Sequence, residues 1–327
     1  MNSYGRLLAC GGLAILAGLG ALAAPAKAQT YPTRSITMIV PFAAGGPTDV
    51  VARIVTGHMA QTLGQSIIIE NVVGAGGTTA TTRAARAAND GYTLITGHMG
   101  THAASVPLYP KLAYHPEKDF EPVALLASTP ILILARKDFP PKDLKEFIAY
   151  VKANEAKVNA AHAGIGSVSH ASCELLNSIL GINPTGVPFN GTGPAMNALV
   201  GGQVDYMCDQ IVNAVPQING GTIKAYAIAT PERNPSLPNV PTTTDGGLPA
   251  FQAQAWNAIF APKGTPPAVV AKLNAAAAKS LDDENVRKRL LDLGSVIPGP
   301  ADRTPEALAA LVKSEIAKWT PVLKPAS

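Results

Sequence analysis

The sequence predicts an α/β protein of two lobes, each a mainly parallel sheet flanked by helices, with a cleft between them. The first observation behind this prediction is a strand, a glycine turn and a helix in succession, an order found twice in residues 35–88 and twice in residues 158–200. Because each such unit crosses over to a neighbouring parallel strand, each pair predicts one sheet. The second observation is length, since 327 residues with 47% hydrophobic residues suffice for two packed cores.

The first 28 residues have the pattern of a signal peptide. Arg6 supplies a positive start, an Ala-, Leu- and Gly-rich run follows over 7–24, and Ala26-Lys27-Ala28 resembles a cleavage site. A membrane anchor is a weaker interpretation because the run is short and rich in small residues, and a lipoprotein signal is weaker because most of the run follows Cys10. We therefore predict an exported, periplasmic protein that is cleaved after Ala28.

The rest of the chain divides into three segments. We expect lobe 1 to comprise residues 29–128 and 251–327, and lobe 2 to comprise residues 129–250. Two apolar strands around Pro130, namely Pro122–Ser128 and Ile131–Ala135, form the passage into lobe 2, and Trp256–Ala261 returns to the first sheet. Three helices then complete lobe 1, over 266–280, 283–293 and 304–320, the last with an apolar stripe for packing.

The first glycine turn, residues 41–49, has the features of an anion site. It follows the apolar run Ser35–Val40, a predicted buried strand, and precedes a helix with Pro47 at its first position and Gly64 at its end. The first N–H groups of a helix have no partner within it, and the helix dipole favours a negative charge there. Since residues 41–49 include no Lys or Arg, main-chain N–H groups and the Thr48 hydroxyl would have to hold the anion.

Three further turns share this character, at 74–79, 164–170 and 190–194, and none of them contains Lys or Arg. Each alone is typical of an ordinary helix cap. Ligands of parallel sheets, however, bind outside the carboxyl ends of the strands, where all four turns are predicted to lie. Four together indicate a site for a small anion between the lobes.

Composition and motifs argue against other function classes. Charged residues are 15% and aromatic residues 5% of the chain, and the basic residues are dispersed, which argues against nucleic acid. No dinucleotide or phosphate-binding motif is present, so we expect no cofactor. No Gly-x-Ser-x-Gly elbow surrounds Ser167, Ser169 and His170, which argues against a serine hydrolase. His98 and His102 have the spacing of metal ligands but no third ligand beside them, so we expect no metal.

Several polar positions allow two interpretations. Asp49 is four residues before Arg53 and fits a first-turn acid on the helix dipole. Asp209, at a strand end, could accept a hydrogen bond from a ligand or cap the helix that follows. Cys173 and Cys208 could form a disulfide in an oxidising compartment or remain two buried thiols.

A family resemblance rests on motifs that run in order along nearly all of the mature chain. They are Val40–Asp49, Gly74–Gly77, Asp90–Leu94, Gly166–His170, Phe189–Ala195 with Leu199–Asp205, and Gly247–Pro249 through Trp256 to Pro262–Pro266. The chain resembles the tripartite tricarboxylate transporter substrate-binding family, the Bug-type periplasmic receptors. The resemblance implies a type II periplasmic binding fold that captures a small organic carboxylate and presents it to an integral-membrane permease, without a chemical step.

The resemblance and the turns together imply a set of ligand-binding residues: Phe42, Ala44, Gly46, Pro47, Thr48, Asp49, Gly76, Gly77, Thr78, Thr79, His98, Ser167, Ser169, His170, Phe189, Asn190, Gly191, Thr192, Gly193 and Asp209. Among them we expect five hydroxyl donors, Thr78, Thr79, Ser167, Ser169 and Thr192, and an apolar wall of Phe42 and Phe189. We expect a monomer. The alternatives are a ligand sensor for a membrane kinase and a two-lobe enzyme that acts on a small carboxylate.

This chain departs from the family pattern at positions near the expected cleft. Val72-Val73 stands where the family commonly has Arg-Pro, and Asn190 where it often has Lys, Arg or Ser. Cys173 and Cys208 are also not typical of the family. The ligand's second functional group therefore stays open among dicarboxylates, acidic amino acids and aromatic carboxylates.

Overall fold

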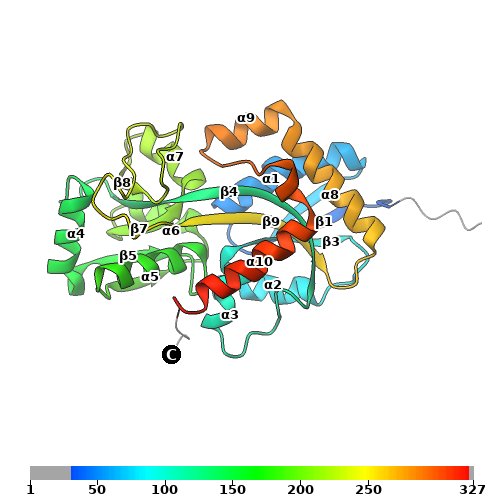
Figure 1. The fold of residues 1–327 in the computed structure, drawn as a ribbon, viewed down its shortest axis with the longest axis horizontal. Coiled ribbons are helices and arrows are strands. Elements are labelled where there is room, and N and C mark those ends of the chain that lie inside the picture. The colour runs from blue at the N-terminus through cyan, green and yellow to red at the C-terminus, as the bar shows by residue number, and fades with distance from the viewer. Residues whose placement is uncertain (1–30, 324–327) are drawn as a thin grey trace, which may run out of the picture.

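The computed structural model describes residues 31–323, so the predicted signal peptide lies outside the described residues. Within that range nine strands form one mixed sheet in the order β2-β1-β3-β9-β4-β7-β5-β6, with β8 paired to β4. Figure 1 shows the sheet running the length of the molecule with helices along it, lobe 2 on the left and lobe 1 on the right. Over the same residues, no helix combines the length and the apolar character needed to cross a membrane.

Lobe 1 contains the first predicted parallel strands. Its strands are β1 (Ile36–Val40), β2 (Ile67–Asn71), β3 (Thr93–His98) and, antiparallel to β3, β9 (Gln254–Pro262). The crossover helices are α1 (Pro47–Leu63) and α2 (Thr78–Ala85), the latter after the short helical turn η1 (Ala75–Gly77). As predicted, Pro47 begins α1, and Gly64 ends it with a φ of 70°, a conformation that glycine adopts without strain.

Lobe 2 repeats the arrangement. The strands β5 (Asn159–His162), β6 (Thr185–Pro188) and β7 (Tyr206–Gln210) are parallel, and β8 (Ile223–Ile228) runs antiparallel to β4. The helices are α4 (Leu144–Ala153), α5 (Val168–Leu180), α6 (Thr192–Val200) and α7 (Ile211–Asn219), with the short turn η3 (Glu155–Lys157) before β5. The predicted order of strand, glycine turn and helix is therefore confirmed in both lobes.

The passage between the lobes is one strand, so the prediction of two strands around Pro130 was wrong. β4 (Phe120–Arg136) is continuous over 17 residues and serves both lobes. It pairs with β9 as far as Pro130, opposite Gln254, and with β7 from Ile131, opposite Gln210. The proline, which lacks an N–H donor, thus lies where the partner strand changes, a position at which the missing donor costs the ladder little. We propose the lobe boundaries at 128/129 and 250/251, beside this crossing.

The remaining helices cover lobe 1. They are the π-helical turn η2 (Gly100–Ala104), α3 (Ser105–Leu108), α8 (Pro267–Asp282), α9 (Glu284–Asp292), the turn η4 (Pro300–Arg303) and α10 (Pro305–Trp319). The apolar stripe predicted for the last helix faces β4 and η2, with Leu308, Val312 and Trp319 buried. The Trp319 and Trp256 indole N–H groups both donate to Glu315 Oε2, which fixes this helix on the sheet.

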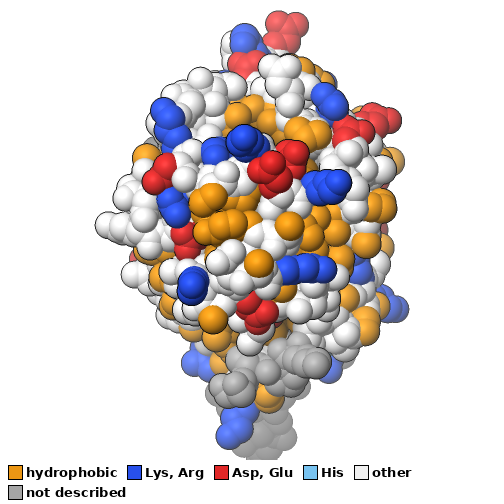
Figure 2. Space-filling view, turned by 90° about the vertical axis from the view of Figure 1, so that its left-hand side faces the viewer, with side chains coloured by type: hydrophobic (Ala, Val, Ile, Leu, Met, Phe, Trp, Pro, Cys, Tyr) orange, Lys and Arg blue, Asp and Glu red, His pale blue; other side chains and the backbone are white. Residues whose placement is uncertain are grey.

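The two hydrophobic cores lie on the two faces of the sheet and not one in each lobe. On β4, Ile131 and Ile133 belong to one cluster and Leu132 and Leu134 to the other, as the alternation of a strand requires. Each cluster contains residues of both lobes, so the core continues through the crossing. On the end face of lobe 2 shown in Figure 2, basic and acidic side chains are interspersed between apolar ones.

Candidate functional site

An inner cavity lies between the lobes, at the carboxyl ends of β1, β3, β5 and β7. It encloses about 280 Å³ free of protein atoms, counting its open side. Lobe 1 contributes Phe42, Gly46, Pro47, Thr48, Asp49 and His98, and lobe 2 contributes Ala163, Ser167, Val168, Ser169, Thr192 and Gln210. The edge of the sheet predicted from the four glycine turns is therefore where this cavity lies.

Four helix N-termini meet at this cavity. Their first residues or N-caps line it: Gly46 and Pro47 of α1, Ser167 and Val168 of α5, Thr192 of α6, and Gln210 ahead of α7. Each N-terminus carries roughly half a positive charge on its unpaired N–H groups. Among the described residues that line the cavity none is Lys or Arg, so the positive potential comes from the main chain. Such a site suits a small anion.

Two serine hydroxyls are held so that one of their two protons is available to a ligand. Ser167 Oγ accepts a hydrogen bond from the backbone N–H of His170 (3.2 Å), and Ser169 Oγ accepts one from that of Ala163 (2.9 Å). The two Oγ atoms are 3.2 Å apart, and both side chains are almost fully buried. Since one hydroxyl proton suffices for the bond between them, the other is free to donate to a ligand.

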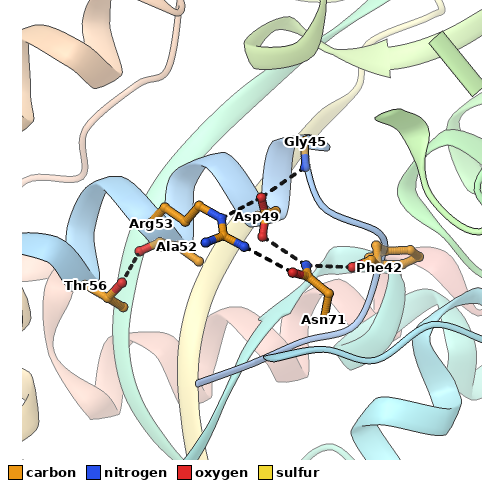
Figure 3. Close-up of polar contacts among 7 residues, drawn as sticks. All are labelled: Phe42, Gly45, Asp49, Ala52, Arg53, Thr56 and Asn71. Atoms are coloured by element: carbon orange, nitrogen blue, oxygen red, sulfur yellow. Dashed lines mark hydrogen bonds and ion pairs between the residues drawn. The ribbon is translucent and has the colours of Figure 1, made fainter. Parts of the chain in front are cut away.

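Both carboxylate oxygens of Asp49 accept hydrogen bonds from neighbouring residues of lobe 1 (Figure 3). Its Oδ2 accepts from Gly45 N (3.0 Å) and Arg53 Nε (2.8 Å), and its Oδ1 accepts from Asn71 Nδ2 (2.9 Å). Asn71 Nδ2 also donates to Phe42 O (2.9 Å). Burial alone would raise the pKa of Asp49, but these hydrogen bonds, that of Arg53 first, lower it. The ion pair expected between Asp49 and Arg53 is thus present, and it shapes the turn after β1.

His98 faces the cavity as a neutral hydrogen-bond donor. Its Nδ1 accepts from the backbone N–H groups of Gly100 (2.8 Å) and Thr101 (3.3 Å), which places the ring proton on Nε2. The ring stacks on Phe42 with centroids 5.0 Å apart, and burial lowers its pKa to about 3. His102 instead stacks on Phe260, and no group of three His, Cys, Asp or Glu among the described residues could hold a metal ion.

An outer cavity of about 1080 Å³, counting its open mouth, adjoins the inner one, and Phe42 and Ala163 line both. Its other lining residues are Gly74, Ala75, Gly76, Gly77, Tyr109, His162, Gly164, Ile165, Gly186, Pro188, Phe189 and Asn190.

The lobes touch across the cleft. Ala43 N donates to Asn190 O (3.0 Å), and Tyr109 Oη donates to Ile165 O (2.7 Å). These are hydrogen bonds between the lobes, so the described conformation is a closed one.

Residues 51–327 match the family described as the tripartite tricarboxylate transporter family receptor. The chain belongs to this receptor family.

Solved structures agree with this assignment. The receptor is similar to MatC of Rhodopseudomonas palustris with bound malate, at 61% identity and a TM-score of 0.88 over 89% of this chain and 99% of that one. It is similar to the periplasmic binding protein BugD, at 42% identity and a TM-score of 0.87 over 90% and 100%. Rpa4515 of R. palustris with adipate is 32% identical, with a TM-score of 0.86 over 90% and 100%. The predicted Bug-type resemblance and two-lobed periplasmic binding fold are confirmed.

Seven of the residues expected in the receptor's site line neither cavity: Ala44, Thr78, Thr79, His170, Gly191, Gly193 and Asp209. Thr78 Oγ1 donates to Ala75 O (2.9 Å) and Thr79 is exposed, so the expectation that both hydroxyls reach the cavity does not fit the structure. Gly193 lies at the contact between the lobes, where a Cβ on it would come within 3.1 Å of Ala44 O.

Asp209 lies behind the cavity wall, fully buried. Its Oδ1 accepts from Gln210 N (2.8 Å) and its Oδ2 from Asn213 Nδ2 (2.6 Å), and the same Asn213 amide donates to Thr192 O (3.2 Å). Asp209 therefore connects the starts of α6 and α7 through the side chain of Asn213. The interpretation of Asp209 as the cap of α7 was wrong, because the N-cap residue is Gln210. Burial raises its pKa to about 7.

We expect Asp209→Asn to remove a pH-dependent loss of stability. The pKa of Asp209 is higher in the folded than in the unfolded state. Its contribution to the free energy of unfolding is therefore largest below the unfolded pKa near 4, and it is lost as the pH rises toward 7. Between these limits the wild type should lose roughly 2–4 kcal/mol of unfolding free energy relative to the variant. Urea unfolding of both proteins at several pH values measures this difference. Because His98 and the other titrating groups are present in both proteins, their contributions cancel in it. Parallel curves for the two proteins would contradict the assignment.

Three residues that line the inner cavity were missed by sequence reasoning, namely Ala163, Val168 and Gln210. The two apolar residues carry no chemical signal. Gln210 did have one, because it follows Asp209 at the same strand end, and side chains alternate along a strand. The prediction selected the charged residue, whereas the strand directs its neighbour into the cavity.

The structure contains the disulfide that the sequence left open. Cys173 and Cys208, 35 residues apart, join α5 to β7. Both elements reach the cavity at one end, α5 through Ser167 and β7 through Gln210.

Proposed function

We propose that this protein is a periplasmic solute receptor that captures a small organic carboxylate between its lobes. It delivers the ligand to an integral-membrane permease of the tripartite tricarboxylate type, acts as a monomer and performs no chemical step. The observation that carries the proposal is the inner cavity, which four helix N-termini and two serine hydroxyls face and which no Lys or Arg of residues 31–323 lines.

The ligand class we propose is a small dicarboxylate. The inner cavity adjoins the larger outer one, so a ligand can extend from the helix N-termini into it, and MatC, at 61% identity, is described with bound malate. The more distant Rpa4515 is described with adipate, a longer dicarboxylate. Ligand and closure are linked, because a ligand held by both lobes favours the closed form through contacts that the open form lacks.

We expect L-malate to raise the melting temperature of residues 29–327 by several degrees. At a hundredfold excess over its dissociation constant, a ligand that binds only the folded state adds about 2.7 kcal/mol. The protein is first unfolded, dialysed and refolded to remove any ligand carried through purification. Dimethyl malate, which keeps the skeleton and lacks both charges, is the matched control.

A shift with malate alone, with the malate recovered unchanged, supports the receptor. Consumption of malate would support the enzyme alternative instead. An equal shift with the dimethyl ester, or no shift with any small dicarboxylate, would contradict the proposed anion site.

A further inference from the structure

Gln210 presents an unpartnered amide to the inner cavity. It is the last residue of β7, 3% exposed, and lines the cavity directly before α7. Its Oε1 accepts two hydrogen bonds, from Thr129 Oγ1 (2.7 Å) and from Asn257 Nδ2 (3.1 Å). Both acceptor positions of the oxygen are thus occupied. Among the described residues Nε2 has no partner, which leaves its two N–H groups for the cavity.

The two residues that orient Gln210 come from the connection between the lobes. Thr129 belongs to β4 and Asn257 to β9, the strands that pair beside the crossing. All three side chains are buried, and Asn257 also lies opposite His98 in the pairing of β9 with β3. The amide of Gln210 is therefore held by two strands of the sheet and not by a loop.

His98 and Gln210 form a pair of neutral donors at the same cavity. The ring proton of His98 is on Nε2, because two backbone N–H groups donate to Nδ1. The donor of Gln210 is its amide Nε2, because the amide oxygen already accepts two hydrogen bonds. Neither donor carries a charge, and neither can accept a hydrogen bond at the atom that faces the cavity. A buried N–H group without a partner costs free energy, so a bound ligand should bring an acceptor oxygen to this position.

We propose that Gln210 is a specificity-determining residue of the binding site. Its amide, held by Thr129 and Asn257, donates to an acceptor oxygen of the ligand other than the carboxylate at the helix N-termini. That oxygen is a second carboxylate, a hydroxyl or a keto oxygen, and an ammonium group is excluded from the position. The inference rests on the proposed function and assigns one further contact within it.

The test measures L-malate affinity by isothermal titration calorimetry for the wild type, Gln210→Leu and Gln210→Glu at pH 8 and pH 6. The leucine removes the donor, and we expect a dissociation constant about 10–100-fold higher. The glutamate keeps both bonds from Thr129 and Asn257 but turns an acceptor toward the anion, so we expect an increase of more than about 100-fold at pH 8. At pH 6 the ratio of variant to wild-type constants should fall, because a protonated glutamate donates again.

Gln254→Glu is the matched control, since Gln254 lies on β9 near the same crossing but is exposed. It should bind malate as the wild type does. Should Gln210→Glu fail to fold, Gln210→Leu, which buries no charge, decides the question. Three outcomes would overturn the inference but leave the proposed receptor function intact. They are wild-type affinity in Gln210→Leu, a ratio of dissociation constants for Gln210→Glu that does not change with pH, and an equal loss of affinity in the control. Absence of malate binding by the wild type would reject the proposed function and this inference with it.

Discussion

Gly76→Ala is expected to weaken ligand binding by at least about 100-fold while both lobes stay folded. A Cβ at Gly76 would lie 1.7 Å from the carbonyl oxygen of Ile165 and 2.8 Å from its carbonyl carbon. Both are backbone atoms of the other lobe, so they can move away only if the lobes separate. The receptor would be held open, and a ligand that needs both lobes would lose the contacts of one of them. Titration with L-malate and the melting temperature of the unliganded protein measure the two effects.

Gly45→Ala is the control for Gly76→Ala. Both glycines have a positive φ, 84° at Gly45 and 61° at Gly76, so alanine brings about the same backbone strain of roughly 1–2 kcal/mol to each. A Cβ at Gly45, however, meets nothing within 4 Å. Only Gly76→Ala should lose affinity. Equal losses in both variants would mean that strain in the loops, and not the contact between the lobes, controls binding.

Replacing Cys173 and Cys208 together by serine is expected to lower the free energy of unfolding by about 3–4 kcal/mol. The disulfide closes a loop of 35 residues, and in the chain-entropy description a cross-link of that length restricts the unfolded chain by about this amount. Both sulfur positions are buried, so the fold itself should survive. Urea unfolding of the unliganded receptor gives the measurement.

The reductant dependence of that experiment separates the cross-link from the substitution. Dithiothreitol, which reduces the disulfide, should lower the free energy of unfolding of the wild type toward that of the double variant. It should leave the free energy of unfolding of the double variant unchanged. A double variant as stable as the oxidised wild type would show that the disulfide adds nothing to the free energy of unfolding.

The sequence predicted most of the architecture because local signals and global fold agree here. Pro47 and Gly64 mark the ends of α1, and Ser167 and Gly181 mark those of α5, each with the residue type that the backbone geometry requires. The same turns identify the position of the cavity, since strands of a parallel sheet end at one edge.

The remainder depends on contacts distant in sequence. Pro130 suggested a break between two strands, and only the change of partner from β9 to β7 explains how one strand accommodates it. Thr78 and Thr79 belong to the correct loop, but the turn of η1 directs them away from the cavity. Gln210 could have been selected as the strand neighbour of Asp209, but its role as a donor follows only from Thr129 and Asn257, which occupy its amide oxygen.

Within the part of the chain that the structure describes, no Lys or Arg lines the inner cavity, and this has a consequence for the charge of the loaded receptor. Main-chain N–H groups, hydroxyls and neutral side chains can hold an anion, but they do not neutralise it. The complex therefore carries the whole charge of its cargo. Residues 29–327 carry 24 Lys and Arg against 22 Asp and Glu, because Arg6 and Lys27 leave with the signal peptide, so with a dicarboxylate their formal net charge falls from +2 to zero. The isoelectric point is therefore lower in the loaded form than in the empty one. The proposed permease would thus meet two electrically different molecules.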